Sequence, residues 1–165
     1  MMARIVPITV AAAALAGATG CPRKEPNRLD TLPKVRMAIK GQEFELWVAH
    51  SLAEQNKGLM HVKQQQLEPL ADGTMRGMLF VFDFSTRQSF WMKNTVIPLD
   101  IAYISRDGTI VGVFTMAPLD EAHDKYSPDE LYRYAIEANA GVFAKLGLKP
   151  GDRLDIPESI LKGES

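Results

Sequence analysis

Large apolar residues occupy every second position in several short segments, and this alternation restricts the possible folds of the chain more than any other feature. It is clear over residues 35–39 and resumes over residues 44–48. A period of two places successive side chains on opposite faces of a strand, so each segment predicts a half-buried strand. Gly41 and Gln42 lie between the two segments and favour a tight turn. Together they predict a hairpin.

Further segments have the length and composition of strands. Residues 78–82 form a continuous apolar run, which is typical of a strand buried on both faces. Asp107-Gly108 is a strong turn signal between two more apolar segments, and it predicts a second hairpin. Five more candidate strands bring the total to about eight. They are the short apolar patch at residues 90–92 and residues 101–104, 110–114, 133–138 and 153–156.

Two short helices are predicted. Ser51 and Glu54 form a capping box, and Gly58 is a suitable stop, so a helix is expected over Leu52–Lys57. Residues 139–146 predict a second helix, capped by the asparagine at their start. No strand–helix–strand rhythm recurs, so we do not expect a parallel sheet. The predicted fold is mainly β: an antiparallel sandwich or jelly-roll-like, partly closed barrel with two short helices.

The charge balance and the cysteine content exclude several classes of protein. The chain has 19 Lys and Arg against 20 Asp and Glu, which gives a net charge of −1. Without a basic field it is not expected to bind nucleic acid. Cys21 is the single cysteine. An intramolecular disulfide and a cysteine-based zinc site are therefore excluded.

The first 21 residues have the pattern of a signal peptide. Arg4 precedes a mostly apolar run over residues 5–16, which is too short to cross ~30 Å of hydrocarbon but suits a secretory signal. The residues Ala18-Thr19-Gly20-Cys21 resemble a lipobox, so we expect Cys21 to receive a lipid. The alternative is ordinary cleavage after Ala18, which would leave Cys21 as a free thiol.

These features predict an exported protein held to the membrane of the cell envelope by its N-terminal lipid. No aspartate follows the cysteine, which favours the outer membrane or the periplasmic face in a cell with two membranes. Residues 22–33 contain three prolines and are expected to form an extended tether. We expect a single β-rich domain over residues 34–157 and a short polar tail over residues 158–165.

Several motifs resemble those of a known family. The stretches Gly58–Met60, Gly77–Phe82 and Phe90–Thr95, with Ile97–Ile101 after them, are similar to the bacterial and archaeal family called domain of unknown function 192. The resemblance covers Val35–Ile156 and implies an exported, mainly β sandwich of jelly-roll type. The resemblance does not identify an activity or a cofactor, because the family has no established activity.

Two departures from the family pattern bear on a possible ligand site. After Gly-Leu-Met the family usually has an aromatic residue and then arginine, whereas this chain has His61 and Val62. The segment up to Gly77 also contains an insertion around residues 64–66. If the family arginine serves a ligand, this chain lacks it.

Three large apolar residues stand directly before a cation and an amide, and this pattern predicts a binding cleft. Trp91 would be a stacking platform, Lys93 and Asn94 donors, and Asp100 and Glu137 acceptors. The alternative is a buried network that serves the fold, with Lys93 neutralised by Asp100 or Glu137.

Catalysis and metal binding are weaker interpretations. Asp100 and Glu137 allow a hydrolase of an envelope polymer, with one carboxyl as acid and the other as base. Met75 and Met78 offer soft ligands for Cu(I), but methionine more often fills a core, and the three histidines lack metal-ligand spacing. We therefore expect no metal and no cofactor, and the sequence leaves open whether the chain catalyses a reaction. The predicted function is an envelope-facing ligand-binding or accessory module, with a purely structural interaction protein as a further alternative.

Overall fold

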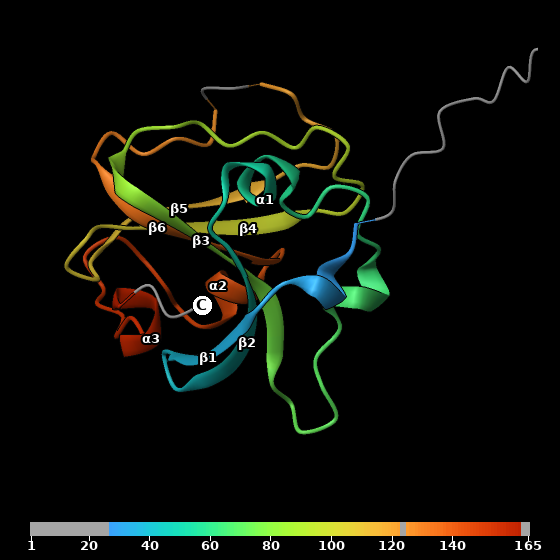
Figure 1. Ribbon diagram of the computed structural model, residues 1–165, viewed down its shortest axis with the longest axis horizontal. Helices are drawn as coiled ribbons and strands as arrows, with labels where there is room; N and C mark the ends of the chain where they lie inside the picture. Colours follow the sequence, from blue (N-terminus) through green and yellow to red (C-terminus); the bar gives the residue numbers. More distant parts are fainter. Residues whose placement is uncertain (1–26, 123–124, 163–165) are drawn as a thin grey trace, which may run out of the picture.

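One six-stranded sheet forms the centre of the structure, a computed structural model that describes residues 27–122 and 125–162 (Figure 1). Its strands lie in the order β1-β2-β3-β6-β4-β5, with β1 and β5 at the edges. The mainly β prediction is confirmed, but the sheet is not closed into a barrel. The strands are β1 (Lys34–Ile39), β2 (Gln42–Ala49), β3 (Met75–Thr86), β4 (Leu99–Ile104), β5 (Ile110–Met116) and β6 (Tyr132–Asn139).

The predicted signal peptide, the lipid site at Cys21 and the first part of the tether lie outside the described residues. The described helices are all short. They are α1 (Leu52–Lys57), α2 (Val142–Lys145), α3 (Glu158–Leu161) and the 3-10 helices η1 (Leu29–Thr31) and η2 (Gln64–Leu67).

Both predicted hairpins are confirmed. β1 pairs antiparallel with β2 through a turn at Lys40 and Gly41, both of which have positive φ. β4 pairs antiparallel with β5 through the turn that contains Asp107-Gly108. Helix α1 has the predicted bounds and a complete capping box. These features are local, so the residues that specify them are close together in the sequence.

The prediction of a wholly antiparallel sheet is wrong at one pairing. β2 runs parallel to β3, with Phe44 opposite Met75 and Ala49 opposite Phe80. The chain crosses from β2 to β3 through α1 and η2, which makes a strand–helix–strand unit. The sequence predicted α1 itself, but this strand–helix–strand unit occurs once, between antiparallel hairpins, so no recurring rhythm indicated a parallel pairing.

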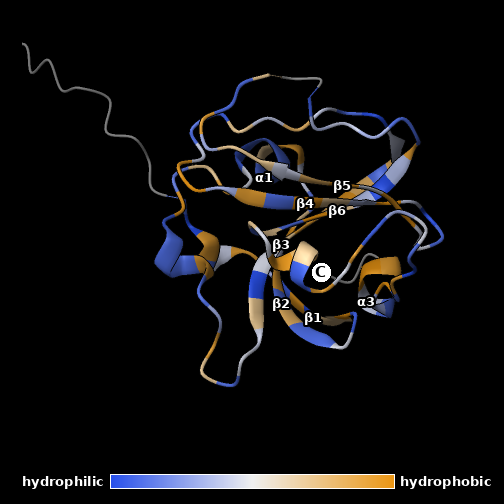
Figure 2. Cartoon of the chain, turned by 180° about the vertical axis from the view of Figure 1, so that it is seen from behind, coloured by the Kyte–Doolittle hydropathy of each residue, from blue (hydrophilic) through white to orange (hydrophobic). Residues whose placement is uncertain are grey.

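A single sheet replaces the predicted sandwich. Its central strands are buried on both faces by segments other than a second sheet, and β4, in which every residue is buried, is the clearest case. We call the two sides the α1 face, which carries Phe80 and Tyr103, and the α2 face, which carries Val81 and Ile104. Figure 2 shows apolar residues along the central strands and on the segments that pack against them.

The C-terminal part differs from the prediction in two places. Gly141, with φ of 83°, stands at the N-cap of α2, where Asn139 was expected. The Asn139 side chain instead holds η2, donating to the Leu67 carbonyl at 2.8 Å and accepting from Gln64 Nε2 at 2.7 Å. The predicted strand over residues 153–156 is reduced to one bridge between Arg153 and Thr109.

Candidate functional site

Asp100 lies on the α2 face, where it anchors structure. It is 1% exposed, and one carboxylate oxygen accepts a hydrogen bond from Thr115 Oγ1 at 2.7 Å. The other oxygen accepts from the backbone N–H of Phe143 in α2 at 3.0 Å. Both carboxylate oxygens are therefore engaged in holding β5 and α2 against β4.

Glu137 lies on the opposite, α1 face of the same sheet. It stands opposite Met78 on β3 and Ile101 on β4, and its side chain is 4% exposed. Within the described part of the chain, its carboxyl group has no hydrogen-bond partner, and burial raises the pKa of Glu137 to about 8. The side chain is therefore mostly a neutral carboxylic acid at pH 7, with a proton to donate.

The predicted pairing of these two acids does not occur. Because Ile101 stands opposite Glu137 and Asp100 is its neighbour along β4, the two carboxyl groups project from opposite faces of the sheet. This geometry excludes a general acid–base pair made from Asp100 and Glu137. Met75 and Met78 also lie on opposite faces of the sheet, because they are three residues apart on β3.

Trp91 and Lys93 interact with each other. The Lys93 Nζ lies 4.8 Å from the centroid of the Trp91 ring, a cation–π contact between two half-buried side chains. Across residues 27–122 and 125–162, no carboxylate forms an ion pair with Lys93. The buried network that would neutralise Lys93 is therefore absent from the described structure.

Asn94 shapes the loop that carries Trp91. It has a φ of 56°, a conformation that asparagine tolerates better than most residues, and its carbonyl accepts the His61 N–H at 2.9 Å. Its side-chain amide contacts Met60 Sδ at 3.9 Å. Asn94 therefore joins the loop of residues 88–98 to the segment that follows α1.

A narrow hollow lies where these elements meet, and we call it the Trp91 groove. Glu137 lies in the lining, together with Phe80, Phe90, Trp91 and residues 55–60 from α1 and the turn after it. This part measures about 30 Å³, room for about two water molecules. An adjoining part of about 70 Å³ shares Phe90 and Trp91 and extends to Gln88 and Ser89.

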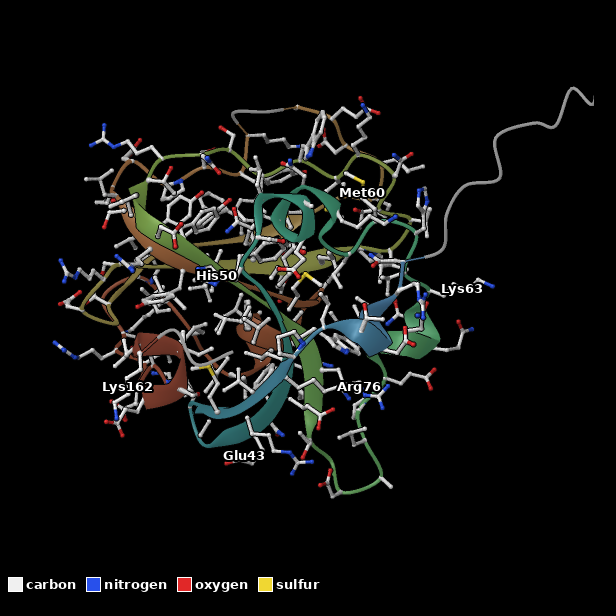
Figure 3. The ribbon with its side chains drawn as sticks, in the orientation of Figure 1. Glu43, His50, Met60, Lys63, Arg76 and Lys162 are labelled. Atoms are coloured by element: carbon white, nitrogen blue, oxygen red, sulfur yellow. The ribbon has the colours of Figure 1, made fainter. Side chains whose placement is uncertain are left out.

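Helix α1 is fixed over the sheet by its own side chains, which gives the groove a stable wall. Gln55 Nε2 donates to the Val81 carbonyl at 2.7 Å and to the His50 carbonyl at 2.8 Å. Gly58 has a φ of 45°, and a Cβ there would lie 3.3 Å from the Phe80 ring. Asn27 Nδ2 donates to the Gly58 and Met60 carbonyls at 2.7 and 2.9 Å. Figure 3 shows Met60 on the turn beyond α1.

The groove combines an aromatic wall with the buried Glu137 carboxyl and the buried hydroxyl of Thr95, which donates to the Lys93 carbonyl at 3.4 Å. A neutral carboxylic acid can donate to a carbonyl, ether or hydroxyl oxygen and accept from a hydroxyl or amide. Phe80 and Phe90 pack edge to face with centroids 4.9 Å apart, so the two rings of this wall support each other. The site is therefore suited to recognising one small polar group held among aromatic rings.

Sequence reasoning found only part of this site. Trp91 and Glu137 line the groove, Lys93 contacts it through Trp91, Asn94 supports it, and Asp100 lies on the other face. The contribution of α1 and Gly58–Met60 was missed. The Gly-Leu-Met motif was the available signal, because a glycine stop directly before an apolar pair requires the chain to turn tightly onto the core.

Two properties of residues 27–122 and 125–162 concern membranes and metals. None of their helices has the length and apolar character required to cross a membrane. Nor do they bring three or more His, Cys, Asp or Glu side chains together in a way that could hold a metal ion.

Comparison with known proteins extends the resemblance noted above. The family model DUF192, described as "Uncharacterized ACR, COG1430", matches residues 35–156. No curated protein matches the chain significantly.

Two solved structures are similar. A protein of unknown function from Novosphingobium aromaticivorans DSM 12444 shares 29% identity at a TM-score of 0.66, over 88% of this chain and 100% of its own. A protein from Sinorhizobium meliloti 1021, described as a proposed transcription regulator, shares 32% identity at a TM-score of 0.59. That match covers 74% of this chain and 91% of the other.

Proposed function

Because the chain belongs to the DUF192 family, and the matched region contains the whole Trp91 groove, we propose that it is a ligand-binding module of the cell envelope. In this proposal the Trp91 groove is the binding site, with Glu137 as its proton donor and Trp91 as its aromatic wall. The protein binds its ligand and does not transform it.

The observation that carries the proposal is the unpartnered acid at the base of the groove. A buried polar group without a hydrogen bond costs about 1–3 kcal/mol, so such groups are uncommon and call for an explanation. No hydrogen bond to the Glu137 carboxyl forms among the described residues, and the carboxyl borders a hollow that has room for water or for a ligand oxygen. A ligand oxygen placed there would supply the missing partner.

The size of the groove restricts what can enter it. Pockets that enclose a whole small molecule typically measure about 300–1,000 Å³, whereas the two parts here are about 30 and 70 Å³. We therefore propose that a carbonyl or hydroxyl group of a larger envelope component inserts into the groove. Lys93, beside Trp91, would contact the remainder of that component outside the hollow.

A thermal-shift screen against solubilised cell-envelope fractions tests this function. A fraction that contains the ligand should raise the Tm of the wild-type chain and should raise that of Glu137→Leu, which has no hydrogen-bonding group, and Trp91→Ala much less. Phe84→Ala is the matched control, because Phe84 is an aromatic residue 81% exposed and outside the groove. Equal stabilisation of all four proteins would contradict binding at this site.

The location of the module is a second part of the proposal. We propose that residues 1–20 direct export and that Cys21 is lipidated, which places the domain at the membrane by a tether that ends before Asn27. Asn27 bonds the turn after α1 and Leu29 is buried in the core, so the second half of the expected tether belongs to the domain. The support is the sequence pattern of Arg4, the apolar run and the small residues before Cys21. Two or more acyl chains are needed for stable anchoring, since each buried CH₂ adds about 0.8 kcal/mol.

Metabolic labelling with a fatty-acid analogue tests the anchor. The wild-type chain should be labelled and should sediment with membranes, whereas Cys21→Ser should be unlabelled and released. Ser85→Ala is a suitable control, since this exposed residue is remote in sequence from the signal region. A wild-type chain that is exported but unlabelled, and soluble without detergent, would favour ordinary cleavage after Ala18 instead.

A further inference from the structure

A second hollow, larger than the Trp91 groove, lies where η1, β1, β2 and the start of β3 meet. It measures about 380 Å³, within the range of about 300–1,000 Å³ that is typical of small-molecule sites. It shares no lining residue with the Trp91 groove. Its lining includes Asn27, Asp30, Lys34, Trp47, Gln66 and Arg76.

Arg76 is the residue that makes this hollow unusual. Its Nη1 donates to the Gln66 carbonyl at 3.2 Å, while its Nε is buried and has no acceptor. Figure 3 shows Arg76 beside η2, at the beginning of β3. Over the described ranges, Arg76 forms no ion pair with any carboxylate. The Nε–H therefore lacks an acceptor, and the guanidinium as a whole lacks a counter-charge.

The nearest strand partner does not supply that counter-charge. Glu45 stands opposite Arg76 in the β2–β3 register, yet its carboxylate bonds Lys34 at 3.0 Å and Arg36 at 3.5 Å. Arg36 also lies 3.8 Å from Asp72. The other cations of this face are therefore paired within the protein, and the charge of Arg76 remains uncompensated.

Two amide groups at the hollow have one unused atom each. The side-chain NH₂ of Asn27 donates one hydrogen bond to the Gly58 carbonyl and one to the Met60 carbonyl. Its side-chain oxygen, Oδ1, is left as an acceptor. Gln66 accepts from the Lys63 N–H, which leaves its NH₂ as a donor. One acceptor and one donor match the N–H and C=O of a secondary amide.

The remaining lining selects the charge and the shape of the ligand. Trp47 is 6% exposed at the hollow, and Lys34 Nζ lies 5.9 Å from the centroid of its ring. Asp30, with a side chain 77% exposed, lies at the rim, where its carboxylate is 4.0 Å from the Arg28 guanidinium. A planar carboxylate suits the forked donors of arginine.

We propose that this hollow, with Arg76 as its anion-binding residue, binds a carboxylate that stands next to a secondary amide. That is the chemistry of a peptide C-terminus or of an N-acyl amino acid. Arg76 binds the carboxylate, and the Asn27 oxygen and the Gln66 NH₂ bind the amide. This inference is independent of the Trp91 groove.

Titration of the full chain, followed by nuclear magnetic resonance, tests the proposal. The probes are N-acetylglycine and N-acetyl-trialanine at constant ionic strength, with N-acetylglycinamide and inorganic phosphate as comparators. The Arg76 Nε–H signal should shift saturably with the two carboxylates. Comparable affinity for both indicates an N-acyl amino acid, and tenfold tighter binding of trialanine indicates a peptide.

Variants connect the binding to Arg76. Arg76→Gln should weaken binding at least tenfold, and Arg76→Lys, which keeps the charge but not the fork, should weaken it less. Arg36→Gln is the matched control, because Arg36 is a paired cation of the same face outside the lining. Its affinity should stay within twofold of wild type.

Three results would overturn the proposal. The first is the absence of saturable shifts with both carboxylates. The second is equal binding of N-acetylglycinamide or tighter binding of phosphate, which would show that a carboxylate is not the recognised group. The third is unchanged affinity in both folded Arg76 variants.

Discussion

Asp100 and Glu137 lie on adjacent strands, one position out of register, and face opposite sides of the same sheet. Their surroundings differ accordingly. Asp100 accepts hydrogen bonds from Thr115 and from the Phe143 N–H, whereas burial leaves Glu137 mostly protonated at the base of a groove. One acid therefore serves the fold, and the other is available to a ligand.

The first prediction concerns the pH dependence of stability. The unfolded Glu137 ionises near pH 4.5, while the folded residue keeps its proton to about pH 8, so the folded state binds more protons between these values. The free energy of unfolding should therefore fall as the pH rises through this window, by about 1 kcal/mol per pH unit, and this contribution should level off above it.

Urea unfolding between pH 5 and pH 8 measures this slope. Glu137→Gln, which cannot ionise, should remove it, while the exposed Glu43→Gln should keep it. The same slope in wild type and Glu137→Gln would show that Glu137 is not the titrating group.

The second prediction concerns Asp100. Asp100→Ala removes the acceptor of the Phe143 N–H and of the Thr115 hydroxyl, and it leaves a buried donor in α2 unpaired. We expect a loss of about 2–4 kcal/mol in the free energy of unfolding. Thr115→Ala removes one exposed partner and should cost about 1 kcal/mol. Equal costs for the two variants would argue against the anchoring role of Asp100.

The third prediction separates a solvated Lys93 from a buried one. Lys93→Met should cost less than about 1 kcal/mol, because the side chain is half-buried and its interaction is a cation–π contact with Trp91. Breaking a buried ion pair would cost about 3–5 kcal/mol instead. Denaturant midpoints of the two proteins distinguish these ranges, and a large loss would restore the buried-network interpretation.

The fourth prediction concerns the glycine at the end of α1. Gly58→Ala should cost about 2–3 kcal/mol, because the residue has positive φ and its Cβ would press on the Phe80 ring. Gly41→Ala is the matched control: φ is also positive, at 81°, but no atom lies within 4 Å of the added carbon. It should cost about 1 kcal/mol. Similar midpoints for both variants would mean that Phe80 moves aside freely.

The sequence by itself determined the features that depend on neighbouring residues. The two hairpins, the capping box of α1 and the burial of residues 78–82 were all predicted correctly, because turn chemistry and alternation act over a few residues. The family resemblance over residues 35–156 was also available from local motifs and is confirmed by the family match.

The tertiary structure alone decided which segments meet. The parallel pairing of β2 with β3 and the separation of Asp100 from Glu137 depend on the register between strands distant in the chain. The Trp91 groove and the unpaired charge of Arg76 likewise arise from contacts across long sequence separations. A single sequence does not encode such contacts as a readable pattern, because they are selected by the free energy of packing the whole domain.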